Sequence, residues 1–267
     1  HALDTRMTAF GFDNRILTGV VTVEHSVAGL GAAQLQDPHG APGSAWQTPS
    51  GTTLSHIYID SGATGTTWRL WGLHRTNLTA AATWRIRVSN AADYSSPTYL
   101  RDYTAAAVAP GIGQAVHLHT ATVTGRYCSI SVSDATNPDG FLNVPLAYAG
   151  PAWVPANGLA YDSADAEEAE QALAVTRGGQ EYPELRFIRR GWEISLPAVL
   201  DVTERRDQLA PMLRWAALGR NVLAIPRADG DPPREAVFGL VRPMGRVGWQ
   251  SGVSEWRAAR LQATERL

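Results

Sequence analysis

The residues best suited to chemistry are few and scattered. His117 and His119 occupy alternate positions of a strand-like run, and alternate side chains of a strand point to the same face. Such a pair can share a metal ion, but the sequence places no third ligand beside it. We therefore expect a hydrated or hydrogen-bonded pair of side chains, and we predict no metal site and no cofactor.

An acidic run lies between Asp162 and Glu170. Clustered carboxylate oxygens are what Ca²⁺ prefers, but this run lacks the regular spacing and the central glycine of a dedicated calcium loop. We favour a solvated run of charge over a calcium site. Residues 165–172, which are rich in alanine and glutamate, predict either a short helix or a solvated loop.

Common catalytic signatures are missing from the sequence. The chain has no lysine, so it has no GxxxxGK phosphate loop, and it contains neither GxSxG nor HExxH. The segment Gly111-Ile112-Gly113 lacks the third glycine of a dinucleotide fingerprint. The single cysteine, Cys128, lies in an alternating run that predicts a buried thiol rather than a nucleophile. We therefore predict no catalytic residues and no enzymatic activity.

Aromatic residues are a stronger signal, because the chain has nine tryptophans. An exposed ring can stack on the apolar face of a sugar, whereas a buried ring packs a hydrophobic core. Core packing is the favoured interpretation for each tryptophan of the first half, and most of all for Trp71. These residues are Trp46, Trp68, Trp71 and Trp84.

Composition narrows the classes of function. The 267 residues carry 23 basic side chains, all arginine, and 25 acidic ones, for a formal net charge of −2. A balance so close to zero argues against general nucleic-acid binding, which needs a basic face. No apolar run approaches the roughly 20 residues of a membrane-spanning helix, and we expect neither a signal peptide nor membrane insertion.

Strand signals dominate the first half. Short runs rich in β-branched and aromatic residues alternate with Gly, Pro, Asn and Ser, which is typical of an antiparallel sandwich or barrel. A Pro- and Gly-rich segment, residues 137–162, predicts a junction. We therefore predict two domains, residues 1–150 and 151–267. The predicted strands of the first domain are 16–24, 54–60, 66–73, 83–89, 115–123 and 127–132.

The second domain is predicted to combine strands with one helix. Apolar residues spaced by three and four give the helix, at about 202–218, one apolar face. Pro211 inside it predicts a kink or a late start. The fold class is therefore mainly β, with a β-sandwich in each domain and one flanking helix in the second. The predicted strands here are 185–189, 192–200, 221–226, 235–241 and 255–263.

Four stretches of the first domain, in order, resemble the discoidin-like, or galactose-binding-like, jelly roll. A Trp-containing segment, 44–47, precedes a strand ending in Asp-x-Gly at 60–62; then come a strand leading into a His-Asn turn and a strand of the form tixixxS at 83–89. The His-Asn pair is here split as His74-Arg75-Thr76-Asn77. The resemblance covers about residues 10–135. The candidate ligand-binding residues are Trp46, Asp60, His74 and Asn77.

The order of elements in the second domain is similar to the tail-tube and distal-tail proteins of bacterial viruses. That resemblance implies a hexameric ring that joins the tail tube to the tip or baseplate, within a virion assembled in the host cytoplasm. Its partners would be other copies of the chain, the tail tube protein, other baseplate or tip proteins, and host-surface glycan. The main prediction is therefore a structural tail protein. The alternative is a free-standing carbohydrate-binding, lectin-like protein, and the third interpretation is a glycosidase or esterase in the second domain.

Overall fold

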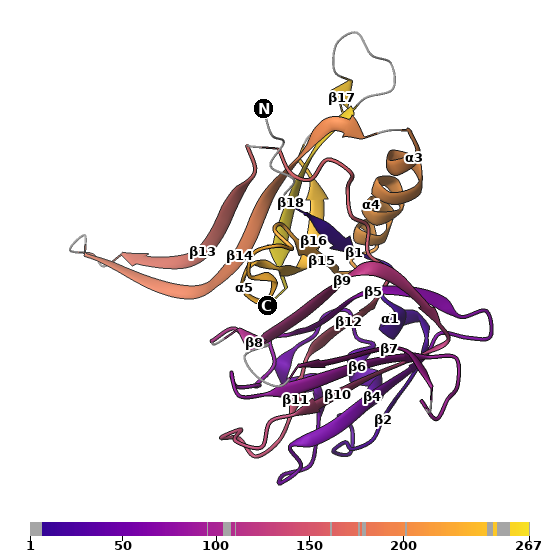
Figure 1. Cartoon of the computed structure of the whole chain (residues 1–267). Helices are drawn as coiled ribbons and strands as arrows, with labels where there is room; N and C mark the ends of the chain where they lie inside the picture. Colours follow the sequence, from indigo (N-terminus) through magenta and orange to yellow (C-terminus); the bar gives the residue numbers. More distant parts are fainter. Residues whose placement is uncertain are drawn as a thin grey trace. The chain divides into compact units, whose positions relative to one another are not determined.

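The computed structural model describes residues 7–94, 96–103, 108–109, 111–160, 162–175, 177, 180–200, 202–244, 248–249 and 257–266. The chain is mainly β, as predicted (Figure 1). It divides into two compact units. The sandwich unit contains the described residues of 7–154 together with 223–236, and the arm unit contains those of 155–222 and 237–266.

Two antiparallel sheets form the sandwich unit. One has the strand order β2-β4-β10-β6-β7 and the other the order β12-β5-β9-β8. A short ladder joins β3 to β11. The strands are β2 (Val20–Val23), β3 (Trp46–Gln47), β4 (Leu54–Asp60), β5 (Thr66–His74), β6 (Thr83–Ser89), β7 (Pro97–Tyr103), β8 (Val108–Ala109), β9 (Gln114–Gly125), β10 (Tyr127–Ser133), β11 (Asn143–Val144) and β12 (Leu146–Gly150).

The core of this unit lies between the two sheets. Alternate residues of β10 and β4, such as Ile130 and Ile57, point inward and are fully buried, together with Trp68 and Trp71 of β5. Alternation follows from the pleat of a strand, which sends successive side chains to opposite faces. The predicted strands 54–60 and 83–89 coincide with β4 and β6. The remaining alternate residues of β4 and β10 form the outer face, and most of them, among them Tyr58 and Asp60, are partly exposed.

The predicted strand 16–24 is wrong in its first half. Residues 15–18 form the short helix α1 (Arg15–Thr18), and only β2 is extended. Asn14 caps the helix, because its side chain accepts a hydrogen bond from the Ile16 amide at 3.1 Å. Two other short helical segments of this unit are α2 (Ala32–Leu35) and the 3₁₀ turn η1 (Pro42–Ser44).

A distant segment completes the sandwich unit. β1 (Ala9–Gly11) pairs antiparallel with β15 (Val222–Ile225), and the short helix α5 (Pro232–Glu235) follows. The buried Gln114 amide donates to the carbonyls of Pro233 at 2.9 Å and Ala236 at 2.8 Å. Residues 223–236 therefore belong with the first unit, whereas the predicted boundaries assigned them to the second.

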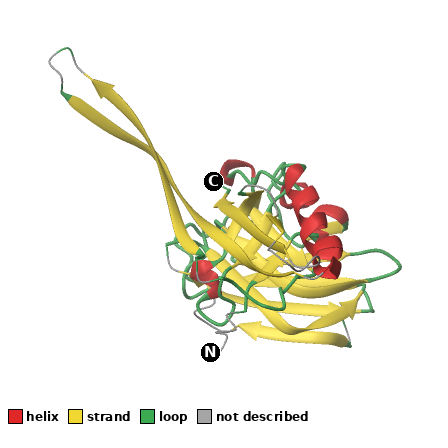
Figure 2. Ribbon diagram, turned by 90° about the horizontal axis from the view of Figure 1, so that it is seen from above, coloured by secondary structure: helices red, strands yellow, loops and turns green. Residues whose placement is uncertain are grey.

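The arm unit contains the strands β13 (Ala164–Val175), β14 (Glu181–Leu200), β16 (Val237–Pro243), β17 (Gly248–Trp249) and β18 (Arg257–Glu265). Their order is β16-β18-β14-β13, and β17 also pairs with β18. The pairing of β14 with β18 begins at Gly191. Residues 167–175 and 181–190 therefore form a two-stranded ribbon, which we call the arm and which extends beyond the other strands of its unit (Figures 1 and 2).

One continuous helical segment lies in the arm unit. It consists of α3 (Val202–Glu204), the π-helical turn η2 (Arg205–Leu209) and α4 (Ala210–Ala217). Pro211 is the second residue of α4 and lies inside the continuous helical segment, where proline cannot donate the usual backbone hydrogen bond. In the wider π turn the Ala210 amide bonds to the Arg205 carbonyl. The irregularity expected at Pro211 is therefore a π turn just before it. Among the described residues, no helix is long and apolar enough to cross a membrane.

Candidate functional site

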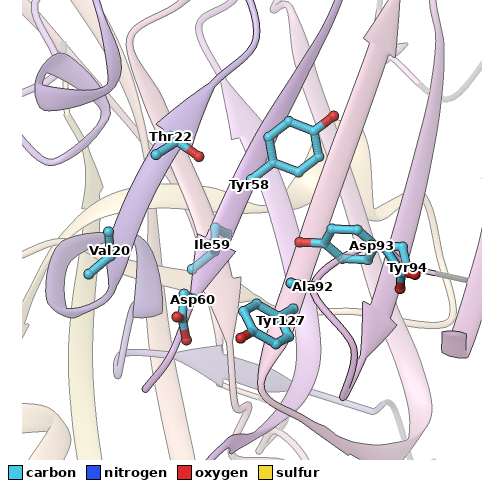
Figure 3. A pocket seen from close by; sticks show the side chains of 9 residues that line it. All are labelled: Val20, Thr22, Tyr58, Ile59, Asp60, Ala92, Asp93, Tyr94 and Tyr127. Atoms are coloured by element: carbon cyan, nitrogen blue, oxygen red, sulfur yellow. The ribbon is translucent and has the colours of Figure 1, made fainter. Parts of the chain in front are cut away.

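A hollow of about 440 Å³ lies on the outer face of the sandwich unit (Figure 3). We call it the tyrosine hollow, because three tyrosine rings line it. Its volume falls within the range of about 300–1,000 Å³ that is usual for small-molecule sites. The lining residues are Val20, Thr22, Tyr58, Ile59, Asp60, Ala92, Asp93, Tyr94 and Tyr127.

Three adjacent strands and one turn position these side chains. Tyr58 and Asp60 are alternate residues of β4, so both point outward while Ile59 between them enters the core. Thr22 of β2 pairs with Tyr58 on one side, and Tyr127 of β10 pairs with Asp60 on the other. Figure 3 accordingly shows the β2 residues on one side of β4 and the remaining rings on the other.

The three rings lie close to one another. The ring centroids of Tyr58 and Tyr94 are 5.9 Å apart, and those of Tyr94 and Tyr127 are 6.5 Å apart in an edge-on arrangement. Tyr94 comes from the turn after β6 and has a φ of 55°, a conformation that residues other than glycine seldom adopt. Its hydroxyl donates to the Cys128 carbonyl at 3.0 Å. The turn thus holds the Tyr94 ring beside β10.

An ion pair sets the charge at the lower edge of the hollow. Arg126 donates two hydrogen bonds to the Asp60 carboxylate, at 2.8 and 2.7 Å. The Gly62 amide donates a third, at 2.8 Å. The Arg126 bonds are the main cause of a lowered Asp60 pKa. The same guanidinium lies 4.8 Å from the centroid of the Tyr127 ring. Asp60 is thus ionised, fixed in place and electrically compensated.

The phenols of Tyr58 and Tyr94 stay protonated at neutral pH. Burial is the main cause of the raised pKa values of Tyr58 and Tyr94, and neighbouring negative charge raises both further. A protonated phenol can donate a hydrogen bond as well as accept one. The hollow therefore offers ring faces, hydroxyl donors and carboxylate acceptors, a set of groups that suits an uncharged polyhydroxylated ligand better than an anion.

Asp60 is the one sequence-predicted site residue that lines the hollow. Trp46 is fully buried, and its indole N–H donates to the His25 carbonyl at 2.9 Å. It is a core residue, so its ring faces cannot meet a ligand. His74 is also buried, 1 % exposed, and its Nδ1 is hydrogen-bonded to the Gln114 side chain.

Asn77 has a structural function in the loop after β5. Its amide donates to Asp139 at 2.9 Å and to the Phe141 carbonyl at 2.8 Å, and its oxygen accepts from the Asn143 amide at 2.8 Å. These bonds tie the loop to the segment before β11. The structure therefore does not bring Trp46, Asp60, His74 and Asn77 together into one site.

The histidine pair of β9 is part of an aromatic stack. The His117 ring lies 5.6 Å from the Trp71 ring, and its Nε2 is 2.5 Å from the Tyr99 hydroxyl. His119 lies 4.5 Å from the Tyr99 ring, measured between centroids. His117 is thus hydrogen-bonded, whereas the His119 ring packs against Tyr99. Within the described ranges, no group of three or more His, Cys, Asp or Glu side chains is placed to hold a metal ion.

The acidic run is extended and lies in β13, so both predictions for it, a helix and a loop, are wrong. Glu168 accepts two hydrogen bonds from Arg189 of β14, each 2.8 Å long. Asp162, just before the strand, accepts one from Arg260 at 2.6 Å. Arginine side chains from neighbouring strands thus compensate part of this charge.

Sequence reasoning missed the tyrosines of the hollow. Tyr58 carried a usable signal, since it is a large aromatic residue at an outward position of a well-predicted strand. Tyr94 and Tyr127 lie more than 30 residues away along the chain. Strand pairing brings Tyr127 close to Tyr58, and the turn after β6 brings Tyr94 there. The sequence specified neither arrangement.

No protein-family profile matches the chain, and no curated protein is significantly similar to it. Solved structures are similar to about half of it. Chitosan-binding module 1 of a Paenibacillus chitosanase/glucanase is 22% identical and has a TM-score of 0.40; the match covers 52% of this chain and 98% of that one. The family 32 carbohydrate-binding module of Clostridium perfringens NanJ, solved with galactose, is 9% identical with a TM-score of 0.39, covering 55% and 99%.

A third similar structure is a GH29 fucosidase of Ruminococcus gnavus, solved with fucose. It is 16% identical with a TM-score of 0.41, and the match covers 55% of this chain but only 28% of the fucosidase.

Proposed function

We propose that the sandwich unit binds carbohydrate at the tyrosine hollow. The observation that carries the proposal is the grouping of Tyr58, Tyr94 and Tyr127 around one space on an exposed sheet face. Aromatic rings provide apolar contact area at little conformational cost, and their hydroxyls add hydrogen bonds. Sugars present the matching combination of apolar C–H faces and hydroxyl edges.

Charge supports the same ligand class. Asp60 is compensated by Arg126, so its oxygens are oriented acceptors rather than an uncompensated negative charge. Oriented carboxylates accept hydrogen bonds strongly, and a sugar offers vicinal hydroxyl donors. No step of chemistry is required of these residues, which fits the absence of catalytic signatures in the sequence.

A glycan array followed by affinity electrophoresis in polysaccharide gels tests this function. We expect saturable retention by at least one glycan, and a loss of about tenfold or more in affinity for Tyr58→Ala and Tyr127→Ala, since each removes a ring worth about 1.5 kcal/mol. Tyr182→Ala is the matched control, because Tyr182 is an exposed tyrosine on the arm. Binding that survives both hollow variants would overturn the proposal.

We propose a second role for the arm unit, namely assembly with other copies of the chain. The motivating observation is the arm, where β14 has β13 as its only described neighbour. Leu185 and Ile188 of the arm are 52% and 47% exposed. Two-stranded ribbons are at best marginally stable in water, and exposed apolar residues on one are normally covered by a partner. The ring of a viral tail or baseplate, implied by the order of elements, is the assembly that we propose.

Light scattering after size exclusion tests the assembly role. We expect a mass several times that of one 28.7 kDa chain, and a shift toward that single mass in the double variant Leu185→Asp, Ile188→Asp. Strand alternation places Tyr182 on the other face of the arm, so Tyr182→Ser is the matched control. A wild-type protein that stays monomeric at high concentration rules this role out.

A further inference from the structure

The aromatic surface of the tyrosine hollow continues along β4. His56 and Tyr58 are alternate residues of that strand and project from the same face. Their ring centroids are 5.7 Å apart, and the two ring planes differ by only 7°. Figure 3, which looks onto the strands, shows the Tyr58 ring nearly face-on. The two rings are therefore nearly parallel neighbours on the outer face of β4, and the Tyr58 ring presents a face outward (Figure 3).

His56 is held in this orientation by a neighbour. Its Nδ1 lies 2.5 Å from a carboxylate oxygen of Glu24, and the Glu24 amide donates to the His56 carbonyl at 3.0 Å. The His56 side chain is only 26% exposed. Because one ring nitrogen is bonded to Glu24, rotation of the ring is restricted and the flat surface is in place before any ligand arrives.

The strand beside this surface leaves it uncovered. Ser129 and Ser131 of β10 pair with Tyr58 and His56, and both serines lie on the outer face, because Cys128 and Ile130 enter the core. Their short hydroxyl side chains cannot shield the neighbouring rings. Arg87 of β6 lies beyond Ser129, and its charge opposes the rise in the Tyr58 pKa. Ser131 and Arg87, both partly exposed, thus border the aromatic surface on the β10 side, whereas Ser129 is buried, at 4% exposure.

We infer that the tyrosine hollow is the first of at least two adjacent subsites, and that the ligand is an oligosaccharide chain running along β4 from Asp60 toward His56. The four residue steps from Asp60 to His56 span about 13 Å at the rise of a β-strand, more than one sugar ring occupies. One unit would occupy the hollow, and the next would stack on Tyr58 and His56. The inference rests on the proposed carbohydrate-binding function. It specifies that the ligand is a chain of several sugar units rather than a single terminal sugar.

Calorimetric titration with graded oligosaccharides tests the inference. The probes are two uncharged series of one to four units, β-1,4-linked N-acetylglucosamine oligomers and β-1,4-linked galactose oligomers. We expect affinity for the bound series to rise about three- to tenfold from one unit to three, the gain expected of one further ring contact. His56→Ala should lower trisaccharide affinity by the same factor and remove the dependence on length.

Glu24 serves as a positioning residue, so its variants separate placement from charge. Glu24→Ala should reproduce the loss seen in His56→Ala, whereas Glu24→Gln, whose amide oxygen can still accept from Nδ1, should largely restore trisaccharide binding. His39→Ala is the matched control, since His39 is an exposed histidine bonded to Asp37 and lies outside β4. Unchanged unfolding temperatures confirm that each variant folds.

The outcomes distinguish a failure of the second subsite from a failure of carbohydrate binding. Equal affinity for one and three units, with binding still lost in Tyr58→Ala, overturns the chain inference and leaves the proposed function standing. The absence of any saccharide binding overturns both. Length dependence that survives His56→Ala overturns the placement of the second subsite on β4.

Discussion

His117 lies in a stack with Trp71 and Tyr99 and is 9% exposed. Burial is the main cause of the lowering of its pKa from 6.5 to about 4, and the charges of Arg101 and His119 lower it further. A sequence shows the histidine but not the loss of water around it. The same imidazole that suggested a metal ligand is held neutral by its surroundings.

This pKa predicts how stability changes with pH. Between about pH 6.5 and pH 4 the unfolded chain binds a proton at this position and the folded chain does not. The free energy of unfolding should therefore fall as the pH is lowered through that range, by roughly 3 kcal/mol in total. Urea titrations at pH 7 and pH 4 measure the change. The difference in the free energy of unfolding between pH 7 and pH 4 should be smaller by about 3 kcal/mol in His117→Phe. It should be unchanged in the exposed control His39→Ala, and an equal pH dependence in both variants would contradict the assignment.

At the residue scale, residue type predicted which tryptophans are buried better than it predicted which residues could bind a ligand. The core interpretation is confirmed for Trp46, Trp68, Trp71 and Trp84, each at most 3% exposed. The predicted ligand-binding residues do not form one site, because large apolar rings such as that of Trp46 pack in the core and are not available at the surface. The tyrosines of the hollow lie on the outer face of the sheet, where their hydroxyl groups can form hydrogen bonds.

At the scale of elements, alternation was a reliable guide and helix propensity was not. The strands 54–60 and 83–89 were predicted at their observed limits, because one face of each is apolar and the other polar. The run 165–172 misled, since Ala and Glu favour helix in isolation. Here a 20-residue partner, β14, supplies the hydrogen bonds and arginine side chains that keep it extended. Such tertiary pairing cannot be derived from local composition.

The arm and the candidate site illustrate the same limit. Two separate strands, 185–189 and 192–200, were predicted where β14 is continuous. Arg190 and Gly191, which lie between them, interrupt the apolar pattern; in the structure Arg190 is bonded to Glu265 of β18. The extension of the aromatic surface to His56 likewise depends on β2, which brings Glu24 beside it. Neighbouring strands decide which side chains become a surface.

At the scale of the whole molecule, the units are not continuous in sequence. The sandwich unit includes residues 223–236, which lie in sequence between the helix of the arm unit and its last three described strands, β16 to β18. Sequence reasoning placed the junction near residue 150, and the two units divide after Val154. Nothing in the sequence indicated that residues 223–236 belong to the sandwich unit, because β15 and α5 carry no motif.

The returning segment predicts the behaviour of a fragment. Residues 7–154 alone would leave the Gln114 amide without its two carbonyl acceptors and β1 without β15. We expect the fragment to unfold with a free energy at least about 3 kcal/mol below that of the sandwich unit in the full chain, as buried amides lose their partners. Fusing residues 223–236 to the fragment through a flexible linker should restore most of the loss, and denaturant titration measures both. Equal stability of fragment and full chain would contradict this account.

Cys128 gives the sandwich unit a built-in reporter. It is the chain's single cysteine, it is fully buried, its sulfur accepts a hydrogen bond from the Trp71 indole at 3.2 Å, and burial raises its pKa to about 12. A thiol so enclosed is inert until the sheets separate. The rate at which a thiol reagent labels the protein therefore reports how often this core opens spontaneously. A bound ligand that holds the outer strands together should lower that labelling rate.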